Sequence, residues 1–201
     1  SLIRKGTLEI GAPVKEAVLS EQLGISRAPI REALQVLVQE GLITSEPQKG
    51  KHVRQMTGKE IYDSYVVAGI LEGAGVAESL PLWTEANMET FRAVVRQMEG
   101  KISYATKLDE LAEIDELFHA TLFMACDNTR LVEMARTSCA TISKYLYYQH
   151  WITMFTPREY ADRHHAVAEA VYSRDVKHVE TALRDHYKET GLRMAQFGKE
   201  A

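Results

Sequence analysis

The stretch Gly24-Ile25-Ser26-Arg27-Ala28-Pro29-Ile30-Arg31-Glu32-Ala33-Leu34 decides how the N-terminal quarter of the chain folds. Ser26 is a good N-cap for a helix, and Pro29 stands in the first turn, where a missing N–H costs nothing. Gly24 suits the tight turn that precedes this helix, and Ser20 is placed to cap a shorter helix that ends there. The stretch therefore predicts two helices joined by a tight turn, which is a helix–turn–helix.

The residues after the second helix predict a β-hairpin. Gly41 is a C-cap that ends the helix, and residues 42–44 and 52–54 are typical of two short strands. The turn between them falls at residues 48–51. A hairpin that directly follows a helix–turn–helix is a wing, so residues 1–56 are expected to form a winged-helix domain.

Several polar residues of this domain are suited to DNA. A helix in the major groove reads bases with its first turns, which hold Ser26, Arg27 and Arg31. Arg pairs bidentately with guanine, and Ser reaches phosphate oxygens. The wing tip, with Lys49 and Gly50, offers short basic contacts that fit a minor groove. A capped helix with solvated arginines is the alternative, but the ordered string together with the wing favours DNA binding.

Composition and charge place the rest of the chain. The 201 residues carry a formal charge of −4, with 45% apolar and 26% charged residues, which excludes a disordered chain. Residues 1–56 have a net charge of +2 and the remainder −6. No apolar run approaches the ~18 residues of a membrane span, and two cysteines make no disulfide framework. A cytoplasmic protein with a basic head and an acidic body is expected.

The body is expected to be entirely helical. Breaks at Pro81, Gly100, Asp127-Asn128, Thr156-Pro157 and Ser173-Arg174 separate its helical segments. The helices are predicted at residues 57–80, 85–104, 109–125, 129–151, 157–173 and 175–197. Such helices with short loops form an antiparallel bundle. The predicted fold is therefore mostly α: a winged helix–turn–helix at 1–56, and an all-α antiparallel helical bundle at 57–201.

Three histidines and one aspartate of the body are placed to bind a metal. Asp115 and His119 are one helical turn apart and leave the same face of a helix. His164 and His186 stand at similar distances from the turn near Arg174, so an antiparallel helix pair brings them level. Asp-x3-His alone occurs often by chance, but imidazoles from three helices with a carboxylate predict a divalent cation, for which zinc or nickel fits best.

The helix predicted at 129–151 carries an unusual run of hydroxyl side chains. Thr141, Tyr145 and Tyr148 are spaced to share one face and could line an effector cavity. The alternative is a helix of mixed polarity that packs on its neighbours.

The N-terminal motifs resemble the winged helix of the GntR family. They are Gly6-x-Leu8-x-x-Gly11-x-x-Val14-x-Glu16-x-x-Leu19, the string Leu23–Leu34, Glu40-Gly41-Leu42-Ile43 and Gly50-x-x-Val53. The resemblance implies DNA contacts at the following positions: Ser26, Arg27, Arg31, Lys49 and Gly50, with Ala28 and Pro29 beside them. Ala17 replaces an arginine that usually contacts phosphate. The resemblance also implies that most of the first helix lies before Ser1.

The body resembles the FCD effector domain of FadR-like GntR regulators. The motifs are Asp115-x-x-Phe118-His119-x-x-Leu122, Asn128-x-x-Leu131, His164-x-x-Val167-x-x-Ala170 and Asp175-x6-Ala182-x3-His186. In many members of that family the corresponding aspartate and histidines hold a divalent metal that binds a small carboxylate effector. Leu71-Glu72 also matches, but Ala68 stands where an arginine is common.

These observations predict a transcriptional regulator, not an enzyme. It would bind a palindromic operator as a homodimer, and repression is the commoner mode in the resembled family. A small carboxylate effector would change its affinity for double-stranded DNA, with no membrane involved. A helical metalloenzyme fused to a nucleic-acid module is the alternative, although no general base is evident. A dimerisation body without any ligand is a third reading.

Overall fold

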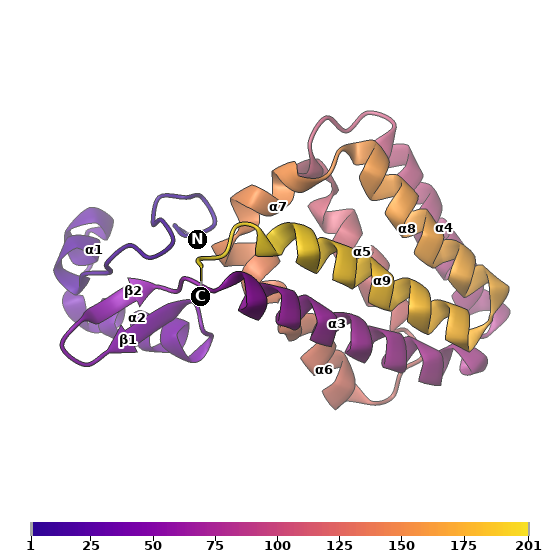
Figure 1. The fold of residues 1–201 in the computed structure, drawn as a ribbon, viewed down its shortest axis with the longest axis horizontal. Helices are drawn as coiled ribbons and strands as arrows, with labels where there is room; N and C mark the ends of the chain where they lie inside the picture. The colour runs from indigo at the N-terminus through magenta and orange to yellow at the C-terminus, as the bar shows by residue number, and fades with distance from the viewer. Residues whose placement is uncertain (1, 201) are drawn as a thin grey trace.

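The computed structural model describes residues 2–200 and shows a small head beside a larger helical body (Figure 1). The head contains α1 (Glu16–Leu23), α2 (Arg27–Gln39), β1 (Ile43–Glu46) and β2 (Gly50–Val53). The body contains α3 (Gly58–Ser79), α4 (Glu85–Ile102), α5 (Ala112–Leu122), α6 (Thr129–Ser138), α7 (Tyr148–Met154), α8 (Pro157–Ser173) and α9 (Val176–Ala195). Two 3₁₀ helices, η1 (Leu80–Leu82) and η2 (Leu108–Leu111), and one π-helix, η3 (Ile142–Leu146), complete it.

The head is the predicted winged helix–turn–helix. Gly24 ends α1 with φ 66°, the left-handed conformation that glycine adopts without strain. The two strands pair antiparallel, with Ile43 opposite Val53. The segment before α1 extends this hairpin, because the Val14 amide donates to the Lys51 carbonyl at 2.8 Å. The mostly α fold class is confirmed.

The predicted cap at Ser20 is wrong. Helix α1 begins one turn earlier, at Glu16, where an acidic side chain suits the positive end of the helix dipole. Ser20 therefore lies inside α1, and its hydroxyl donates to the Ile25 carbonyl at 2.6 Å, bracing the turn into α2. Ser26 does precede α2 in an extended conformation, but its side chain makes no capping hydrogen bond.

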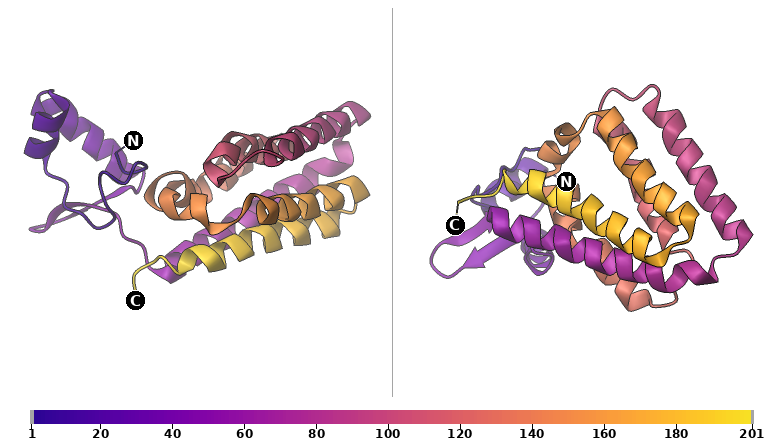
Figure 2. Two further views of the ribbon diagram at one scale, coloured as in Figure 1. Left: turned by 90° about the horizontal axis from the view of Figure 1, so that it is seen from above. Right: turned by 45° about the vertical axis from the view of Figure 1, so that its right-hand side comes forward.

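The body packs its helices as an antiparallel bundle. Capping boxes start α3 at Thr57, α4 at Thr84 and α8 at Thr156, each with a side chain three residues on that bonds back. Helices α3 and α9 lie side by side along most of their lengths (Figures 1 and 2). Gly69 permits this approach, because a Cβ there would stand 2.9 Å from the Cβ of Tyr187.

The single helix predicted for residues 129–151 is wrong, because the chain breaks into α6, η3 and α7. The π-helical turn of η3 buries Ile142 and Leu146, and it shifts the helical register between α6 and α7. Thr141, Tyr145 and Tyr148 consequently do not form the common face that an unbroken helix would give them.

The core of the head continues into the body. One hydrophobic cluster joins Ile3 and Leu34 of the head to Ile61, Tyr147 and Met194 of the body. A second cluster fills the far end of the bundle around Phe91 and Phe118. Among the described residues, only Gly58–Leu82 is long and apolar enough for a membrane span, with a mean hydropathy of 1.2 over its most apolar 18 residues. Half of those 18 residues are buried inside the bundle.

Candidate metal centre and nucleic-acid interface

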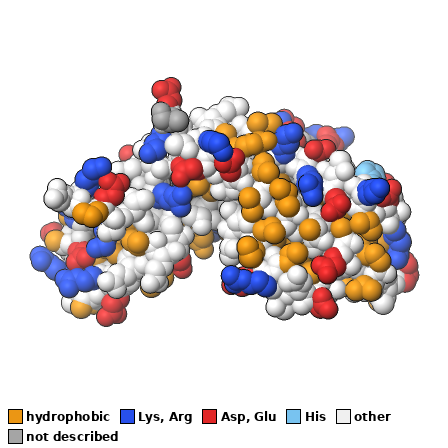
Figure 3. Space-filling view, turned by 60° about the horizontal axis from the view of Figure 1, so that its bottom comes forward, with side chains coloured by type: hydrophobic (Ala, Val, Ile, Leu, Met, Phe, Trp, Pro, Cys, Tyr) orange, Lys and Arg blue, Asp and Glu red, His pale blue; other side chains and the backbone are white. Residues whose placement is uncertain are grey.

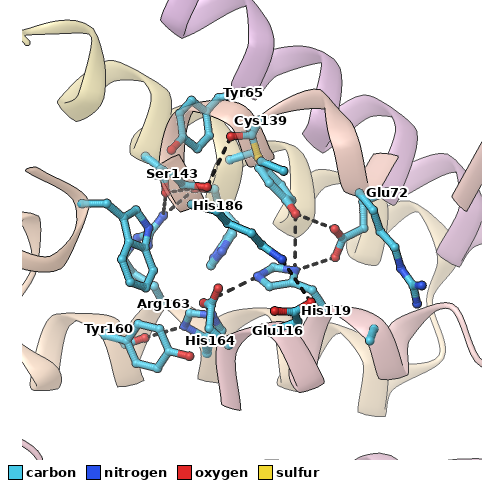
Figure 4. Close-up of a pocket in the computed structure, with 18 of the residues that line it drawn as sticks. Tyr65, Glu72, Glu116, His119, Cys139, Ser143, Tyr160, Arg163, His164 and His186 are labelled. Carbon is cyan, nitrogen blue, oxygen red and sulfur yellow. Dashed lines mark hydrogen bonds and ion pairs between the residues drawn. The ribbon is translucent and has the colours of Figure 1, made fainter. Parts of the chain in front are cut away.

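Helices α5, α8 and α9 bring His119, His164 and His186 together (Figure 4). One ring nitrogen from each histidine lies within 4.8 Å of the others. Asp115 Oδ1 is 3.2 Å from His164 Nε2 and 4.0 Å from His119 Nε2. The four residues predicted as ligands thus occupy one place in the bundle, and their coordination of a metal stays a prediction.

The local fold explains this convergence. Asp115 and His119 are four residues apart on α5, so both point into the bundle. Arg174 and Asp175 turn the chain between α8 and α9, and the antiparallel pair places the rings of His164 and His186 4.8 Å apart.

Hydrogen bonds fix which nitrogens face the centre. His164 Nδ1 donates to the Tyr160 carbonyl at 2.8 Å, and His119 Nδ1 lies 2.7 Å from Glu72 Oε1. Both Nε2 atoms are therefore directed to Asp115. His186 Nδ1 is buried without a hydrogen-bond partner. A carboxylate or carbonyl behind a ligating imidazole is the usual support of metal sites, and the unpartnered buried nitrogen of His186 is available to a cation.

The titration of these groups follows from burial and charge. Burial opposes the charge on His119, but Glu72 outweighs it and raises the pKa of His119 to about 9. Burial lowers the pKa of His164 and, together with Arg163, that of His186 well below its usual range. Burial works against the charge of Asp115, yet its contact with His164 and the nearby charge of His119 keep the pKa of Asp115 below the usual value. At neutral pH the pocket thus holds neutral imidazoles at His164 and His186, a protonated imidazole at His119 and an ionised carboxylate at Asp115.

An inner cavity of about 220 Å³ opens beside the histidines. Three basic side chains line it: Arg136, Lys144 and Arg163. Arg163 is held in place by Glu189 at 2.8 Å and by the Thr190 hydroxyl at 2.6 Å. The hydroxyls of Tyr65 and Tyr160 also line the cavity, buried and without partners. The cavity offers cations and free hydroxyl groups to an anionic ligand.

An outer cavity of about 280 Å³ adjoins the inner one. Tyr145 and Tyr148 line it, whereas Thr141 lines neither cavity. Glu116, which sequence spacing directs away from Asp115, lines both cavities. Consecutive side chains on a helix are rotated by about 100° from each other, so a wide cavity can be lined by both Asp115 and Glu116.

Sequence reasoning about the site's chemistry missed Glu72 and Arg163. Glu72 entered only as part of a family motif, and Arg163 not at all. Glu72 is 2% exposed, and it accepts hydrogen bonds from His119 and from the Tyr187 hydroxyl. Its position in the most apolar helix of the chain was the signal, because a charged residue is rarely buried without a partner.

The predicted DNA contacts lie exposed on the head. They are Ser26, Arg27, Ala28, Pro29 and Arg31 at the start of α2, and Lys49 and Gly50 at the wing tip. Lys and Arg side chains gather at this outer end, among acidic ones (Figure 3). Glu16 pairs with Arg31 and with Lys51, each at 3.3 Å. No ion pair of Arg27 occurs among residues 2–200, which leaves its guanidinium available for a base or phosphate.

Comparisons with known proteins identify both parts of the chain. Residues 1–53 match the family model of bacterial regulatory proteins, gntR family, and residues 63–189 match the FCD domain. The HTH-type transcriptional repressor RspR of Escherichia coli is 26% identical over 94% of this chain and 82% of its own length. The gluconate operon transcriptional repressor of Bacillus subtilis is 30% identical over 63% of this chain and 51% of its own length.

Solved structures agree in fold. Escherichia coli McbR/YncC superposes with a TM-score of 0.72 at 20% identity, covering 97% of this chain and 92% of that one. The relatives are transcriptional regulators and not enzymes, so the metalloenzyme alternative has no support among them. With a winged helix matched at one end and an FCD domain matched over most of the remainder, the chain belongs to the GntR family of bacterial transcriptional regulators, in the branch that carries an FCD effector domain.

Proposed function

We propose that this regulator binds a palindromic operator as a homodimer and changes its affinity for DNA when a small carboxylate occupies a metal site in the body. The single observation that carries the proposal is the convergence of Asp115, His119, His164 and His186 beside a cavity lined by basic side chains. The cytoplasm, where DNA is, would be its place of action.

The four residues fit a divalent cation such as zinc or nickel. His119 and His164 direct Nε2 to Asp115, and His186 has a buried nitrogen with no other partner. A bound metal would supply positions to which carboxylate oxygens coordinate. The protein's own part is to orient the imidazoles, exclude water behind them and surround the ligand with positive charge from Arg136 and Arg163.

A small carboxylate suits this cavity better than a neutral sugar or a fatty acyl chain. Ala68, which stands where relatives commonly have an arginine, is buried and lines neither cavity. Arg163 provides a cation from α8 instead, and the free hydroxyls of Tyr65 and Tyr160 can donate to carboxylate oxygens. The name of the gluconate operon repressor concerns a hydroxycarboxylate, which is consistent with this ligand class.

A homodimer would let two heads reach the two halves of a palindrome. Val67 and Ile70 of α3 are 46% and 40% exposed, and apolar side chains gather on the face of the body shown in Figure 3. Repression is the proposed mode, in keeping with the two repressors named above. Light scattering should give twice the 22.7 kDa chain mass at micromolar concentration, and a monomer there would contradict the dimer.

The effector proposal is tested by a thermal-shift screen of di- and hydroxycarboxylates. Metal-loaded and chelated protein are compared, together with a His164→Ala/His186→Ala variant. A ligand that binds only the folded state raises the melting temperature. We expect a rise with metal-loaded wild type alone. A rise that survives chelation and the double substitution unchanged would refute the metal-dependent mechanism.

A further inference from the structure

The outer cavity lies between the N-terminal segment of the head and the body. Arg4 supplies its wall on the head side, and Lys144, Tyr145 and Tyr148 line it from the body. The proposed effector, which occupies the inner cavity, does not account for Arg4, Tyr145 and Tyr148, which line the outer cavity alone. What the outer cavity binds is therefore a separate question.

Arg4 is held at the cavity without an anionic partner. Its guanidinium carbon lies 4.1 Å from the centre of the Tyr148 ring, and its carbonyl accepts a hydrogen bond from Gln149 Nε2 at 2.7 Å. No carboxylate lies within ion-pair distance of Arg4 in the part of the chain that is described. A positioned cation that faces a cavity and has no counter-ion favours an anionic ligand.

The inner and outer cavities share a wall. Asp115, Ser143 and Lys144 line both of them. Lys144 Nζ is 3.1 Å from Glu116 Oε1, and this ion pair belongs to the shared wall. Because the two side chains are about half exposed or more, water screens their attraction and another carboxylate can replace Glu116. Lys144 therefore borders the space of a ligand that is bound beside Asp115 in the inner cavity.

We propose that the effector is a dicarboxylate, whose first carboxylate lies in the inner cavity and whose second lies in the outer cavity between Lys144 and Arg4. This inference rests on the proposed carboxylate effector and adds its chemical class. The second carboxylate displaces Glu116 from Lys144 and receives hydrogen bonds from the Arg4 guanidinium. Tyr145 and Tyr148 form the side of this outer subsite.

This arrangement makes the head a part of the effector site. Arg4 adjoins Ile3, which is buried in the hydrophobic core of the head with Leu34. A ligand that contacts Arg4 and Lys144 together binds best to one placement of the head against the body. Effector binding therefore selects among head orientations through its own contacts, which is the differential affinity that regulation requires.

The test compares dicarboxylates with monocarboxylates of the same chain length, using calorimetric titration of the metal-loaded full chain. Succinate with butyrate and glutarate with pentanoate are suitable pairs. We expect wild type to bind the better dicarboxylate about tenfold or more tightly than its monocarboxylate partner, as for one added charged hydrogen bond. Arg4→Gln should reduce this preference, because only Lys144 then remains to hold the second carboxylate, and it should leave monocarboxylate affinity unchanged. Lys5 is an exposed neighbour of Arg4 that lines neither cavity, so Lys5→Gln should retain the preference for the dicarboxylate.

Glu116→Gln provides an independent arm, because it frees Lys144 from its ion pair without touching the head. It should strengthen dicarboxylate binding more than monocarboxylate binding. Equal affinities for both ligand types in wild type, or a preference that neither Arg4→Gln nor Glu116→Gln alters, would overturn the outer subsite while leaving the metal-dependent effector intact. Failure of every carboxylate to bind the metal-loaded chain would overturn both proposals.

Discussion

At the scale of single residues, Glu72 carries a large share of the site's organisation. It lies on α3 and is almost completely buried, yet it bonds to His119 Nδ1 at 2.7 Å and to the Tyr187 hydroxyl at 2.5 Å. A buried carboxylate is costly unless it is bonded in this way. Glu72 therefore fixes the orientation of His119 and makes its free nitrogen a better electron donor.

Glu72→Gln should weaken metal binding about 10- to 100-fold, the usual effect of losing a carboxylate behind a ligating histidine. The measurement is a competition titration against a chelator of known affinity. Glu78→Gln, an exposed change on the same helix, should leave metal affinity unchanged. Equal affinities for both variants would show that Glu72 has no supporting role.

Metal uptake should depend on pH through His119. Because Glu72 raises the pKa of His119 to about 9, this imidazole is protonated at pH 7.5 in metal-free protein and must lose its proton to coordinate. The lowered pKa values of His164 and His186 mean that they are already neutral there. Metal affinity should rise as pH increases toward about 9. Calorimetry in buffers of different ionisation enthalpy should detect about one proton released per metal, and a heat independent of buffer would contradict this.

At the scale of elements, close helix contacts position the site. Helix α3 carries Glu72, and helix α9 carries His186. The distance between the two helices therefore sets how far Glu72 lies from the histidine cluster. Gly69 lies at their contact, where a Cβ would come within 3.3 Å of the Arg184 Cα as well as within 2.9 Å of Tyr187. The backbone of α9 cannot yield there without moving the helix.

Gly69→Ala should therefore destabilise the protein by about 1–3 kcal/mol through overpacking, although alanine is the better helix former. Gly100→Ala is the matched control, because it lies in α4 with no atom within 4 Å of its Cβ position, and it should stabilise by about 0.5–1 kcal/mol. Urea denaturation measures both. A stabilising Gly69→Ala would mean that the two helices are not so closely packed.

Helix α2 presents its first turn to solvent, where Arg27 has no carboxylate partner among residues 2–200. Arg27→Ala should cost about 1–3 kcal/mol in affinity for a duplex selected from random DNA, and relax the preference at one base pair. Fluorescence anisotropy measures the affinity. Arg130→Ala, an exposed change on α6 of the body, should have no effect. Indistinguishable affinities would remove Arg27 from the DNA interface.

At the scale of the whole molecule, Tyr147 connects the effector region to the joint between head and body. It follows η3, whose Ser143 and Lys144 line both cavities. Its hydroxyl accepts from the Met56 amide at 3.1 Å and donates to the Met56 carbonyl at 3.3 Å. The C-terminal Lys199 amide also donates to Met56, at 2.9 Å. Met56, which connects the head to α3 of the body, is thus held by Tyr147 and by the segment after α9.

Tyr147→Phe should destabilise the chain by about 1–3 kcal/mol, because the buried Met56 amide loses its hydrogen-bond acceptor. Tyr104→Phe, at a tyrosine that is 69% exposed, should be neutral. Thermal unfolding gives the stabilities, and hydrogen exchange of the Met56 amide reports the joint directly. Unchanged exchange at Met56 would show that the hydroxyl does not hold the linker.

The sequence by itself determined the fold class and the convergence of Asp115, His119, His164 and His186, whose coordination of a metal stays a prediction. The helix break at Thr156-Pro157, the turn glycine Gly24 and the i, i+4 pair Asp115 and His119 are local signals, because helical geometry alone sets which residues meet. Two antiparallel helices joined by a short turn also follow a simple rule, because residues at equal distances from the turn lie level. Counting residues from the turn near Arg174 therefore pairs His164 with His186.

Tertiary structure alone decided the break at η3, the place of Tyr145 and Tyr148 in an outer cavity, and the approach of Arg4 to Lys144. Residues 4 and 144 are far apart in the chain, and no local rule relates them. The π-helical turn of η3 buries Ile142 and Leu146 in the hydrophobic cluster that joins the head to the body. These three features depend on packing between segments that are distant in the chain. The local patterns of a sequence carry no information on such packing.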